Sequence, residues 1–349
     1  MNQSVTKAVF PAAGLGTRFL PITKALPKEM LPIIDKPLIQ YAVEEAVHSG
    51  IQNIYIVTGR GKSAIEDYFD LNYELEHRLT ERQKTDLLAK VHEVMAETVD
   101  VAYVRQKEAL GLGHAVLRAK ALVGQDPFAV VLSDDVIRTV PPVRPCLQQL
   151  LDVYSKFQAP VLALQPVDPS EAEQYGIATG ELVQDEGFAG PVYRVRDLVE
   201  KPRPGQVKST LAIIGRYVLT PDIFGILQHA KPGTGGEIQL TDALKRMLQR
   251  RPIYGICFEG KRYDAGDKLG LLTATLEFAL ENKEIGPRLR KYLRANLDRI
   301  TTEPSGLLRR IAERKEQAAA GPRQSPASVP ENPRRAPTIR RDLRPRMRH

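Results

Sequence analysis

Residues 5–41 decide the fold, and they read VTKAVFPAAGLGTRFLPITKALPKEMLPIIDKPLIQY. The apolar run from Ala8 to Ala13 is typical of a buried strand in a parallel sheet. It leads into Gly14-Leu-Gly16-Thr-Arg18, where two residues without a Cβ let backbone N–H groups face a ligand. The prolines that follow forbid one long helix. A rigid cationic loop after a first strand predicts a polyphosphate-binding site.

Two common phosphate-binding loops are excluded by position. The dinucleotide-binding fingerprint needs a third glycine where this chain has Phe19. The Walker pattern needs a glycine five residues before Gly61-Lys-Ser63, and that position is Ile56. Gly-x-Gly-Thr-Arg with Pro-Lys28-Glu-Met-Leu-Pro ten residues later is a far more specific combination than a lone Gly-x-Gly.

This combination resembles the sugar nucleotidyltransferases, also called sugar-nucleotide pyrophosphorylases, from about Val5 to Leu293. Thymidylyl enzymes of that family typically have a Gly-Gly-Ser-Gly-Thr-Arg loop followed by Ser-Lys-Gln. Ala12-Ala-Gly-Leu15 and Pro27-Lys-Glu29 are instead similar to the uridylyl enzymes. The resemblance implies that the protein makes UDP-glucose and pyrophosphate from UTP and glucose 1-phosphate. The blocks that carry it are residues 5–41, 104–116, 199–202 and 260–268.

Alternating strand and helix patterns give the fold class. Apolar runs at 53–58, 99–104 and 128–132 are separated by helical spacing at 38–48, 62–69 and 113–123. The pattern predicts an α/β fold with a doubly wound, mixed, mostly parallel and Rossmann-like sheet. We expect one catalytic domain over residues 1–298, with a small sugar-binding β region at 160–220. Charged residues 71–98 predict an inserted surface helical hairpin, or an arm for a partner.

Two aspartates are candidate metal ligands. Asp134 follows the strand at 128–132, and Asp264 follows a strand at 253–258. Ligands of open α/β sheets bind outside the carboxyl ends of the strands. From the residues alone, Asp134 could instead cap a helix or form a turn at the strand end. The family resemblance implies that both bind Mg²⁺, which takes few protein ligands and keeps several waters.

The resemblance also implies roles for the other site residues. Arg18 and Lys28 should contact the triphosphate, and Lys201 the attacking sugar phosphate. A side-chain amide such as Gln106 can both donate to and accept from a base edge. The expected nucleotide-binding residues are Ala12, Ala13, Gly14, Gly16, Gln106 and Gly111. The expected sugar-binding residues are Gly176, Glu200, Lys201 and Gly215.

Most of the net charge of +8 lies at the C-terminus. Residues 300–349 contain twelve Lys or Arg against five Asp or Glu, and no aromatic residue follows Tyr292. Six prolines and eight arginines in residues 321–349 predict a disordered basic tail over 299–349. Such a tail could make weak contacts with anionic surfaces. Without aromatic residues to stack on bases, it is not expected to bind a specific nucleic acid.

Other features of the sequence bear on the cellular location, the oligomeric state and the alternative functions. Two cysteines without metal-ligand spacing, no signal-peptide pattern and no apolar run of 18 residues predict a cytoplasmic protein without a membrane span. The resemblance implies a homodimer or homotetramer. Two other functions stay open: a catalytically silent sugar-nucleotide-binding regulatory subunit, and a related transferase for dTTP or another sugar phosphate. A silent module should have lost Lys28, Asp134, Lys201 or Asp264, and all four are present.

Overall fold

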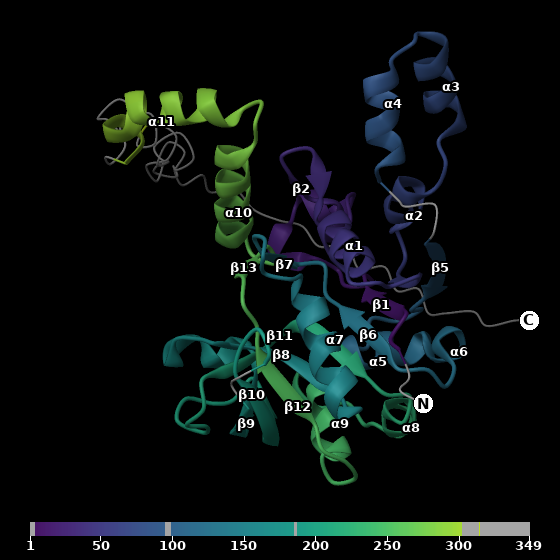
Figure 1. The fold of residues 1–349 in the computed structure, drawn as a ribbon, viewed down its shortest axis with the longest axis vertical. Helices are drawn as coiled ribbons and strands as arrows, with labels where there is room; N and C mark the ends of the chain where they lie inside the picture. Colours follow the sequence, from purple (N-terminus) through teal and green to yellow (C-terminus); the bar gives the residue numbers. More distant parts are fainter. Residues whose placement is uncertain (1–3, 95–98, 185–186, 302–313, 315–349) are drawn as a thin grey trace, which may run out of the picture. The chain divides into compact units, whose positions relative to one another are not determined.

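A nine-stranded sheet forms the centre of the fold (Figure 1). The computed structural model describes residues 4–94, 99–184, 187–301 and 314. The predicted tail therefore lies outside the described residues, apart from its first few residues and Arg314. In spatial order the strands are β5 (Asp100–Arg105), β4 (Asn53–Thr58), β1 (Lys7–Pro11), β6 (Phe128–Val131), β11 (Leu211–Leu219), β8 (Val161–Pro166), β12 (Tyr254–Cys257), β10 (Val192–Glu200) and β9 (Gly176–Gln184).

The strand directions confirm a mixed sheet, with four parallel and five antiparallel pairings among the described residues. Of the nine strands in the described residues, seven run in the same direction, and β10 and β11 run the opposite way. The first four strands in spatial order are all parallel. Their carboxyl ends therefore open at one edge of the sheet, where the loops after β1, β5 and β6 meet.

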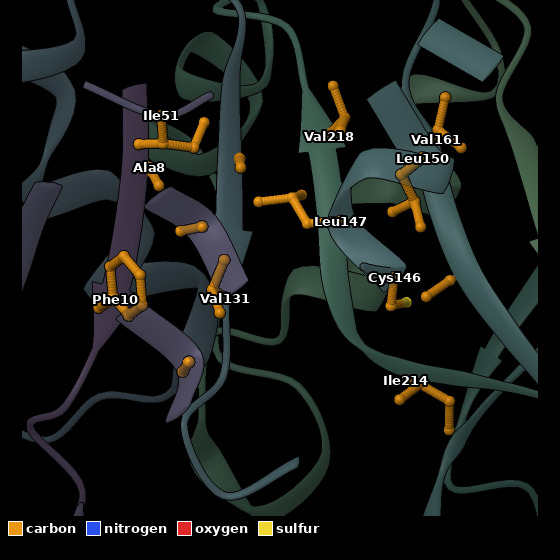
Figure 2. Packing of buried hydrophobic residues seen from close by; sticks show 14 of the residues in the cluster. Ala8, Phe10, Ile51, Val131, Cys146, Leu147, Leu150, Val161, Ile214 and Val218 are labelled. Carbon is orange, nitrogen blue, oxygen red and sulfur yellow. The ribbon is translucent and has the colours of Figure 1, made fainter. Parts of the chain in front are cut away.

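Helices cover both faces of the sheet. Ala8 and Phe10 of β1 point to one face and Val9 to the other, because side chains alternate along a strand. Helices α1 and α7 pack on the first face, where Leu147 and Leu150 of α7 meet the strands (Figure 2). Helices α5, α8 and α9 pack on the second face. The buried helices are α1 (Leu38–His48), α5 (Leu112–Arg118), α7 (Cys146–Phe157), α8 (Ile223–Gln228) and α9 (Leu240–Met247).

Two further helices each add a buried residue to these cores, Ile65 from α2 and Val123 from α6. Helices α3 and α4 pack against each other as a hairpin that bears no buried residue and projects beyond α2 (Figure 1). Residues 95–98, which end the predicted insertion, lie outside the described residues. No helix within 4–94, 99–184 and 187–301 is long and apolar enough to span a bilayer. The helices whose bounds have not yet been given are α2 (Ser63–Phe69), α3 (Tyr73–Glu81), α4 (Thr85–His92), α6 (Lys120–Val123), α10 (Lys268–Glu281) and α11 (Gly286–Thr301).

Two small antiparallel ladders were not predicted from the sequence. Strand β7 (Asp135–Arg138) pairs with β13 (Lys261–Asp264), so that Asp135 lies opposite Asp264. Strand β2 (Pro32–Ile33) pairs with β3 (Lys36–Pro37). Strands this short have too few residues for a periodic pattern, and the β7–β13 pairing joins distant segments. The β7–β13 ladder determines how the candidate metal ligands meet.

Candidate active site

A cleft of about 420 Å³ lies at the carboxyl ends of the parallel strands. The loop after β1 forms one wall, and the loop between β5 and α5 forms another. Lys28, Asp134 and Glu237 supply the charged side chains of the lining, and Pro11, Leu112, Ala115 and Leu132 add apolar ones. The loop residues that line it are Ala13, Gly14, Leu15, Gly16 and Thr17 after β1, and Gln106, Ala109 and Gly111 after β5.

The loop after β1 winds through three short turns: η1 (Thr17–Phe19), η2 (Ile22–Lys24) and η3 (Lys28–Met30). Gly16 precedes η1 with a φ of 64°, in the left-handed region that favours glycine. A Cβ on Gly16 would lie 3.1 Å from both Lys28 Cβ and Thr23 Cγ2. The hydroxyl of Thr23 donates to the Gly16 carbonyl at 2.7 Å, which closes the loop on itself. The glycine therefore lets the chain turn directly against η3.

A buried ion pair fixes η3. Lys62 Nζ, just before α2, lies 2.7 Å from Glu29 Oε2. Their side chains are 8% and 1% exposed. Moving η3 away from Lys62 would leave two buried charges uncompensated, which is costly. The pair therefore holds η3 in place. The neighbouring Lys28 is thereby directed into the cleft, where its Nζ lies 2.6 Å from Asp134 Oδ2.

Two carboxylates and a guanidinium converge on Gly266. A Cβ at this glycine would lie 3.0 Å from Asp264 Oδ1, 3.2 Å from Asp134 Oδ2 and 3.5 Å from Arg18 Nη1. The Ala265 N–H donates to the Asp134 carbonyl at 2.8 Å, which joins the end of β6 to the end of β13. Arg18 donates to the Gly266 carbonyl at 3.4 Å. The structure therefore brings together four of the predicted site residues: Arg18, Lys28, Asp134 and Asp264.

The donor set of this cluster suits a hard divalent cation. Asp134 and Asp264 are each a little over a quarter exposed, and both face the space that the missing Cβ of Gly266 leaves. In the described residues no group of three or more His, Cys, Asp or Glu is placed to hold a metal. Two carboxylates with room for water and phosphate oxygens match the needs of Mg²⁺.

The charges at Asp134 and Lys28 stabilise each other. Burial by itself raises the pKa of Asp134, but the Lys28 ammonium more than compensates and holds that pKa below its ordinary value. Burial likewise disfavours the charged form of Lys28, yet Asp134 and Glu29 leave its pKa raised. Both groups are therefore charged near neutral pH, as metal binding and phosphate binding require.

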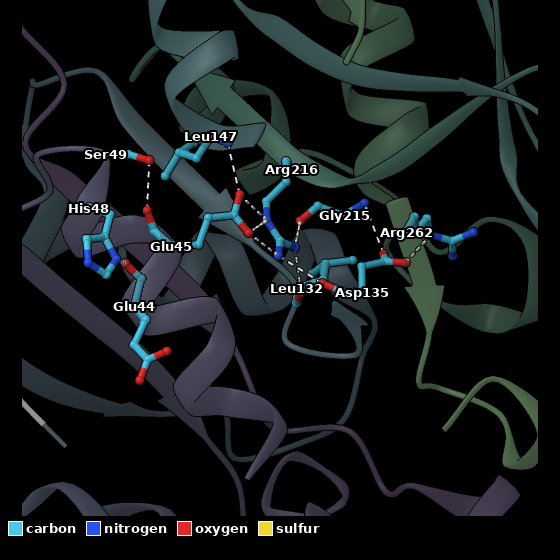
Figure 3. A network of polar contacts seen from close by, with 10 residues as sticks. All are labelled: Glu44, Glu45, His48, Ser49, Leu132, Asp135, Leu147, Gly215, Arg216 and Arg262. Carbon is cyan, nitrogen blue, oxygen red and sulfur yellow. Dashed lines mark hydrogen bonds and ion pairs between the residues drawn. The ribbon is translucent and has the colours of Figure 1, made fainter. Parts of the chain in front are cut away.

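A buried polar network contacts the cluster of Asp134 and Asp264 on its protein side (Figure 3). Arg216 of β11 is 1% exposed and contacts both carboxylate oxygens of Glu45 on α1, at 2.8 to 3.1 Å. It also donates to the Asp135 carbonyl at 2.8 Å. Arg262 of β13 pairs with the Asp135 carboxylate and, at 3.1 Å, with Asp264. Helix α1 and strands β7, β11 and β13 are thereby joined, and Asp264 is held in place.

The predicted base-reading residues line the other end of the cleft. Gln106 is buried directly after β5, and its Nε2 donates to the Gly111 carbonyl at 3.2 Å. Ala13 and Gly14 also line the cleft. Ala12 does not: its side chain belongs to the apolar core, and its N–H donates to Val57 of β4. The cleft wall next to Ala13 is formed by Pro11 instead.

The predicted sugar residues lie outside the 420 Å³ cleft. Glu200 pairs with Gly176 across β10 and β9, and a Cβ at Gly176 would lie 3.0 Å from Glu200 Oε2. Tyr175 connects this region to the acidic cluster, because its hydroxyl accepts from Arg262 at 3.2 Å. Gly215 is packed internally, since a Cβ there would lie 2.6 Å from Leu132 Cβ. Lys201 has a φ of 45° and an exposed side chain without a hydrogen bond to any described residue.

The sequence analysis missed several residues of the site. Glu237 was not assigned to the site, and it lines the cleft beside Gly111. Asp135, Arg216 and Arg262 were not assigned either. The detectable signal was Arg216, a charged residue inside the apolar strand Leu211–Leu219. A charge in such a run requires a buried partner, although the sequence does not identify it.

Comparisons with known proteins agree with this geometry. A family model described as nucleotidyl transferase matches residues 7–280. A UTP–glucose-1-phosphate uridylyltransferase of Bacillus subtilis is 49% identical over 297 residues, which is 85% of this chain and 99% of that protein. A UDP-glucose pyrophosphorylase solved with UDP-glucose has a TM-score of 0.72 and 45% identity, over 80% of this chain and 100% of the other. A UTP-bound enzyme of Acinetobacter baumannii has a TM-score of 0.76 and 39% identity, over 83% of this chain and 98% of the other.

The matched region begins in β1 and ends in α10, so it contains the glycine loop after β1, the acidic cluster and the loop after β5. The family model covers well over half of the chain, and a relative with 49% identity is matched over nearly its whole length. The chain therefore belongs to the nucleotidyl transferase family.

Proposed function

We propose that the protein is a UTP–glucose-1-phosphate uridylyltransferase, which makes UDP-glucose and pyrophosphate from UTP and glucose 1-phosphate. One observation carries this proposal: Arg18, Lys28, Asp134 and Asp264 converge beside a glycine loop at the cleft of about 420 Å³. The relatives named for this activity have the same fold and similar sequences over most of their length.

The reaction is an in-line displacement at phosphorus. A phosphate oxygen of glucose 1-phosphate attacks the α-phosphorus of UTP, the bond to the bridging oxygen breaks, and pyrophosphate leaves. Charge spreads over the phosphoryl oxygens, so catalysis depends on positioning and on fixed cations. Lys28, which Asp134 holds in the cleft, is close enough to exchange that carboxylate for a phosphate oxygen of UTP. Arg18 adds a second positive charge beside Gly266.

Enzymes of this family typically use a divalent metal ion, and we propose magnesium. Asp134 and Asp264 would hold it, because their oxygens face one space and Asp134 stays ionised. When bound, Mg²⁺ would neutralise charge on the triphosphate and help to orient it. Arg262 keeps Asp264 directed toward that space by pairing with its other oxygen.

The sugar is assigned to the region around β9 and β10. Glu200 offers a carboxylate for sugar hydroxyls, and its contact with Gly176 leaves no room for a side chain there. Lys201 is the proposed cation for the attacking phosphate. Its backbone N–H donates to the Tyr175 carbonyl at 2.9 Å, and the Tyr175 side chain contacts Arg262. Hydrogen bonds through Tyr175 and then Arg262 therefore link Lys201 to Asp264 of the acidic cluster.

The alternative functions are less well supported. A silent regulatory subunit would not need Lys28, Asp134 and Asp264 in one cluster. If the cluster were only structural, apolar residues could take its place. A thymidylyl enzyme fits Ala12-Ala-Gly-Leu15 less well. We further propose a homodimer or homotetramer and a cytoplasmic location, the latter on two unpaired cysteines.

Pyrophosphate release by the purified protein tests the proposal. UTP, dTTP, CTP and ATP would each be combined with glucose, galactose, mannose and N-acetylglucosamine 1-phosphates, with Mg²⁺ and then with a chelator. We expect the highest kcat/KM for UTP with glucose 1-phosphate, and loss of turnover with the chelator. No pyrophosphate from that pair would refute the activity, and a higher kcat/KM with dTTP would reassign the nucleotide.

A further inference from the structure

We propose that His114 is a positioning residue that orients the Gln106 side-chain amide, so that the protein accepts uracil and rejects cytosine. The inference deepens the proposed function and rests on its assignment of Gln106 to the base. His114 lies in the first turn of α5 and contacts Gln106, but it lines a separate small cavity of about 210 Å³ and not the cleft.

The hydrogen bonds around Gln106 allow one amide orientation. Its Nε2 lies 3.2 Å from the Gly111 carbonyl oxygen and 2.9 Å from His114 Nδ1. A carbonyl oxygen can only accept, so the amide nitrogen, and not the amide oxygen, must face Gly111. The second amide proton then points at His114 Nδ1, which must be the unprotonated ring nitrogen.

This arrangement leaves the Gln106 carbonyl oxygen for the ligand. Oε1 has no hydrogen-bond partner among the residues at 4–94, 99–184 and 187–301, although Gln106 is only 6% exposed. Since Gln106 lines the cleft, that oxygen is available to a bound base. The site therefore presents an acceptor at this point, and no donor from Gln106.

An acceptor distinguishes the two pyrimidines. Uracil carries a proton on N3 and can donate to Oε1, whereas the N3 of cytosine is an acceptor and would meet it unfavourably. If His114 carried a proton on Nδ1, the two donors would oppose each other. The amide would then gain by turning its nitrogen toward the base, at the expense of the bond to Gly111, and discrimination would fall.

The surroundings of His114 favour its neutral form. Burial lowers the pKa of His114, Arg118 one turn along α5 lowers it further, and Glu108 with its backbone opposes them in part. Lys107 also lines the small cavity, and Glu237 packs against Gly111 on the opposite side of the loop. With the pKa below its ordinary value, His114 accepts from Gln106 at neutral pH, and affinity for uridine nucleotides should fall as acid protonates it.

Two variants at one position separate this role from packing. His114→Leu keeps the bulk but removes the acceptor. His114→Asn keeps an acceptor at the position of Nδ1, since its Oδ1 is equally distant from the backbone, and cannot be protonated near neutral pH. Calorimetric titration with UTP and with CTP, without sugar phosphate, measures discrimination independently of turnover. Melting temperatures establish that both variants fold.

We expect the ratio of UTP to CTP affinity to fall roughly tenfold in His114→Leu and to be largely restored in His114→Asn. Between about pH 7.5 and about pH 5, UTP affinity should weaken more in the wild type than in His114→Asn. Comparing the two proteins cancels the titration of the triphosphate itself. An unchanged ratio in His114→Leu, or identical pH profiles, would overturn the proposal.

A further control distinguishes this proposal from the proposed function. Gln106→Leu should abolish the preference for UTP over CTP, and an unchanged preference would overturn both the role of Gln106 and that of His114. Because the titrations require no turnover, a wild type that prefers UTP but releases no pyrophosphate would refute the enzyme assignment and leave the base-reading mechanism intact.

Discussion

At the scale of single residues, the site depends on charges that hold each other in place. Lys28 and Asp134 are paired at 2.6 Å, and each shifts the pKa of the other toward the charged form. Asp264 is shared between Arg262 and the Gly266 N–H. In the proposed reaction, the substrate phosphates and the metal ion would replace these partners.

Replacing Lys28 should lower the rate more than it weakens binding. A cation beside developing charge acts mainly in the transition state, and loss of one such group costs on the order of 100-fold in kcat. Steady-state kinetics of Lys28→Ala would show this. The matched control is Lys24→Ala, which removes an exposed cation of the same loop and should leave kcat unchanged. A change confined to KM would restrict Lys28 to binding.

Neutralising either acidic ligand should abolish most turnover while the protein still folds. Asp264→Asn and Asp134→Asn each remove one oxygen charge from the proposed Mg²⁺ site, so the Mg²⁺ concentration needed for half-maximal rate should rise at least tenfold. Asp267→Asn is the control in the same loop, because an asparagine can still cap α10 as Asp267 does. Normal rates at limiting Mg²⁺ in both ligand variants would disprove the metal assignment.

At the scale of secondary-structure elements, the β7–β13 ladder and the buried Arg216 assemble the site. The ladder places Asp264 opposite Asp135, directly beside Asp134. Arg216 of β11 connects the Leu132 carbonyl, Asp135 and Glu45 (Figure 3). Arg216 therefore links α1 to the end of β6.

Removing Arg216 should be costly because it leaves Glu45 buried and unpaired. We expect Arg216→Met to lower the free energy of unfolding by about 3–5 kcal/mol. The double variant Arg216→Met/Glu45→Met should recover part of that loss. Chemical denaturation checks both. Arg196→Met, which breaks the exposed pair with Glu181, is the control and should change stability little. Equal effects at the two arginines would contradict a buried structural pair.

At the scale of the whole molecule, residues 1–287 form one compact unit, and the family match ends at residue 280. Every proposed site residue lies before Gly270. The residues after 287 carry a net charge of +11, against −3 for residues 1–287, but they contribute none of the cleft lining in the described ranges. Catalysis and long-range charge are therefore encoded in different parts of the sequence.

Deleting residues 305–349 should leave melting temperature and turnover nearly unchanged. The segment has no aromatic residue and is rich in proline and arginine, so it should add little core burial. Retention on heparin at low salt should fall instead, and salt of roughly 0.5 M should remove the difference from the full chain by screening. A large loss of stability or turnover would mean that this segment docks on the catalytic unit.

The sequence alone determined the alternation of strands and helices and the glycine loop after the first strand, and it supplied the proposed roles of the site residues. Helix 38–48 and strand 53–58 were predicted with the bounds that the structure has. These features follow from local patterns: an apolar run, a glycine pair after a strand, and cations at fixed spacing. Such patterns need no knowledge of what lies next to them in space.

Only the tertiary structure decided which of these residues meet. It brought Asp134 and Asp264 together through a ladder too short to detect, and packed Ala12 in the core although its neighbour Ala13 faces the cleft. It also paired Arg216 with Glu45 and His114 with Gln106. The physical reason is that burial and hydrogen bonding select partners by distance and direction in space, and a one-dimensional pattern specifies neither.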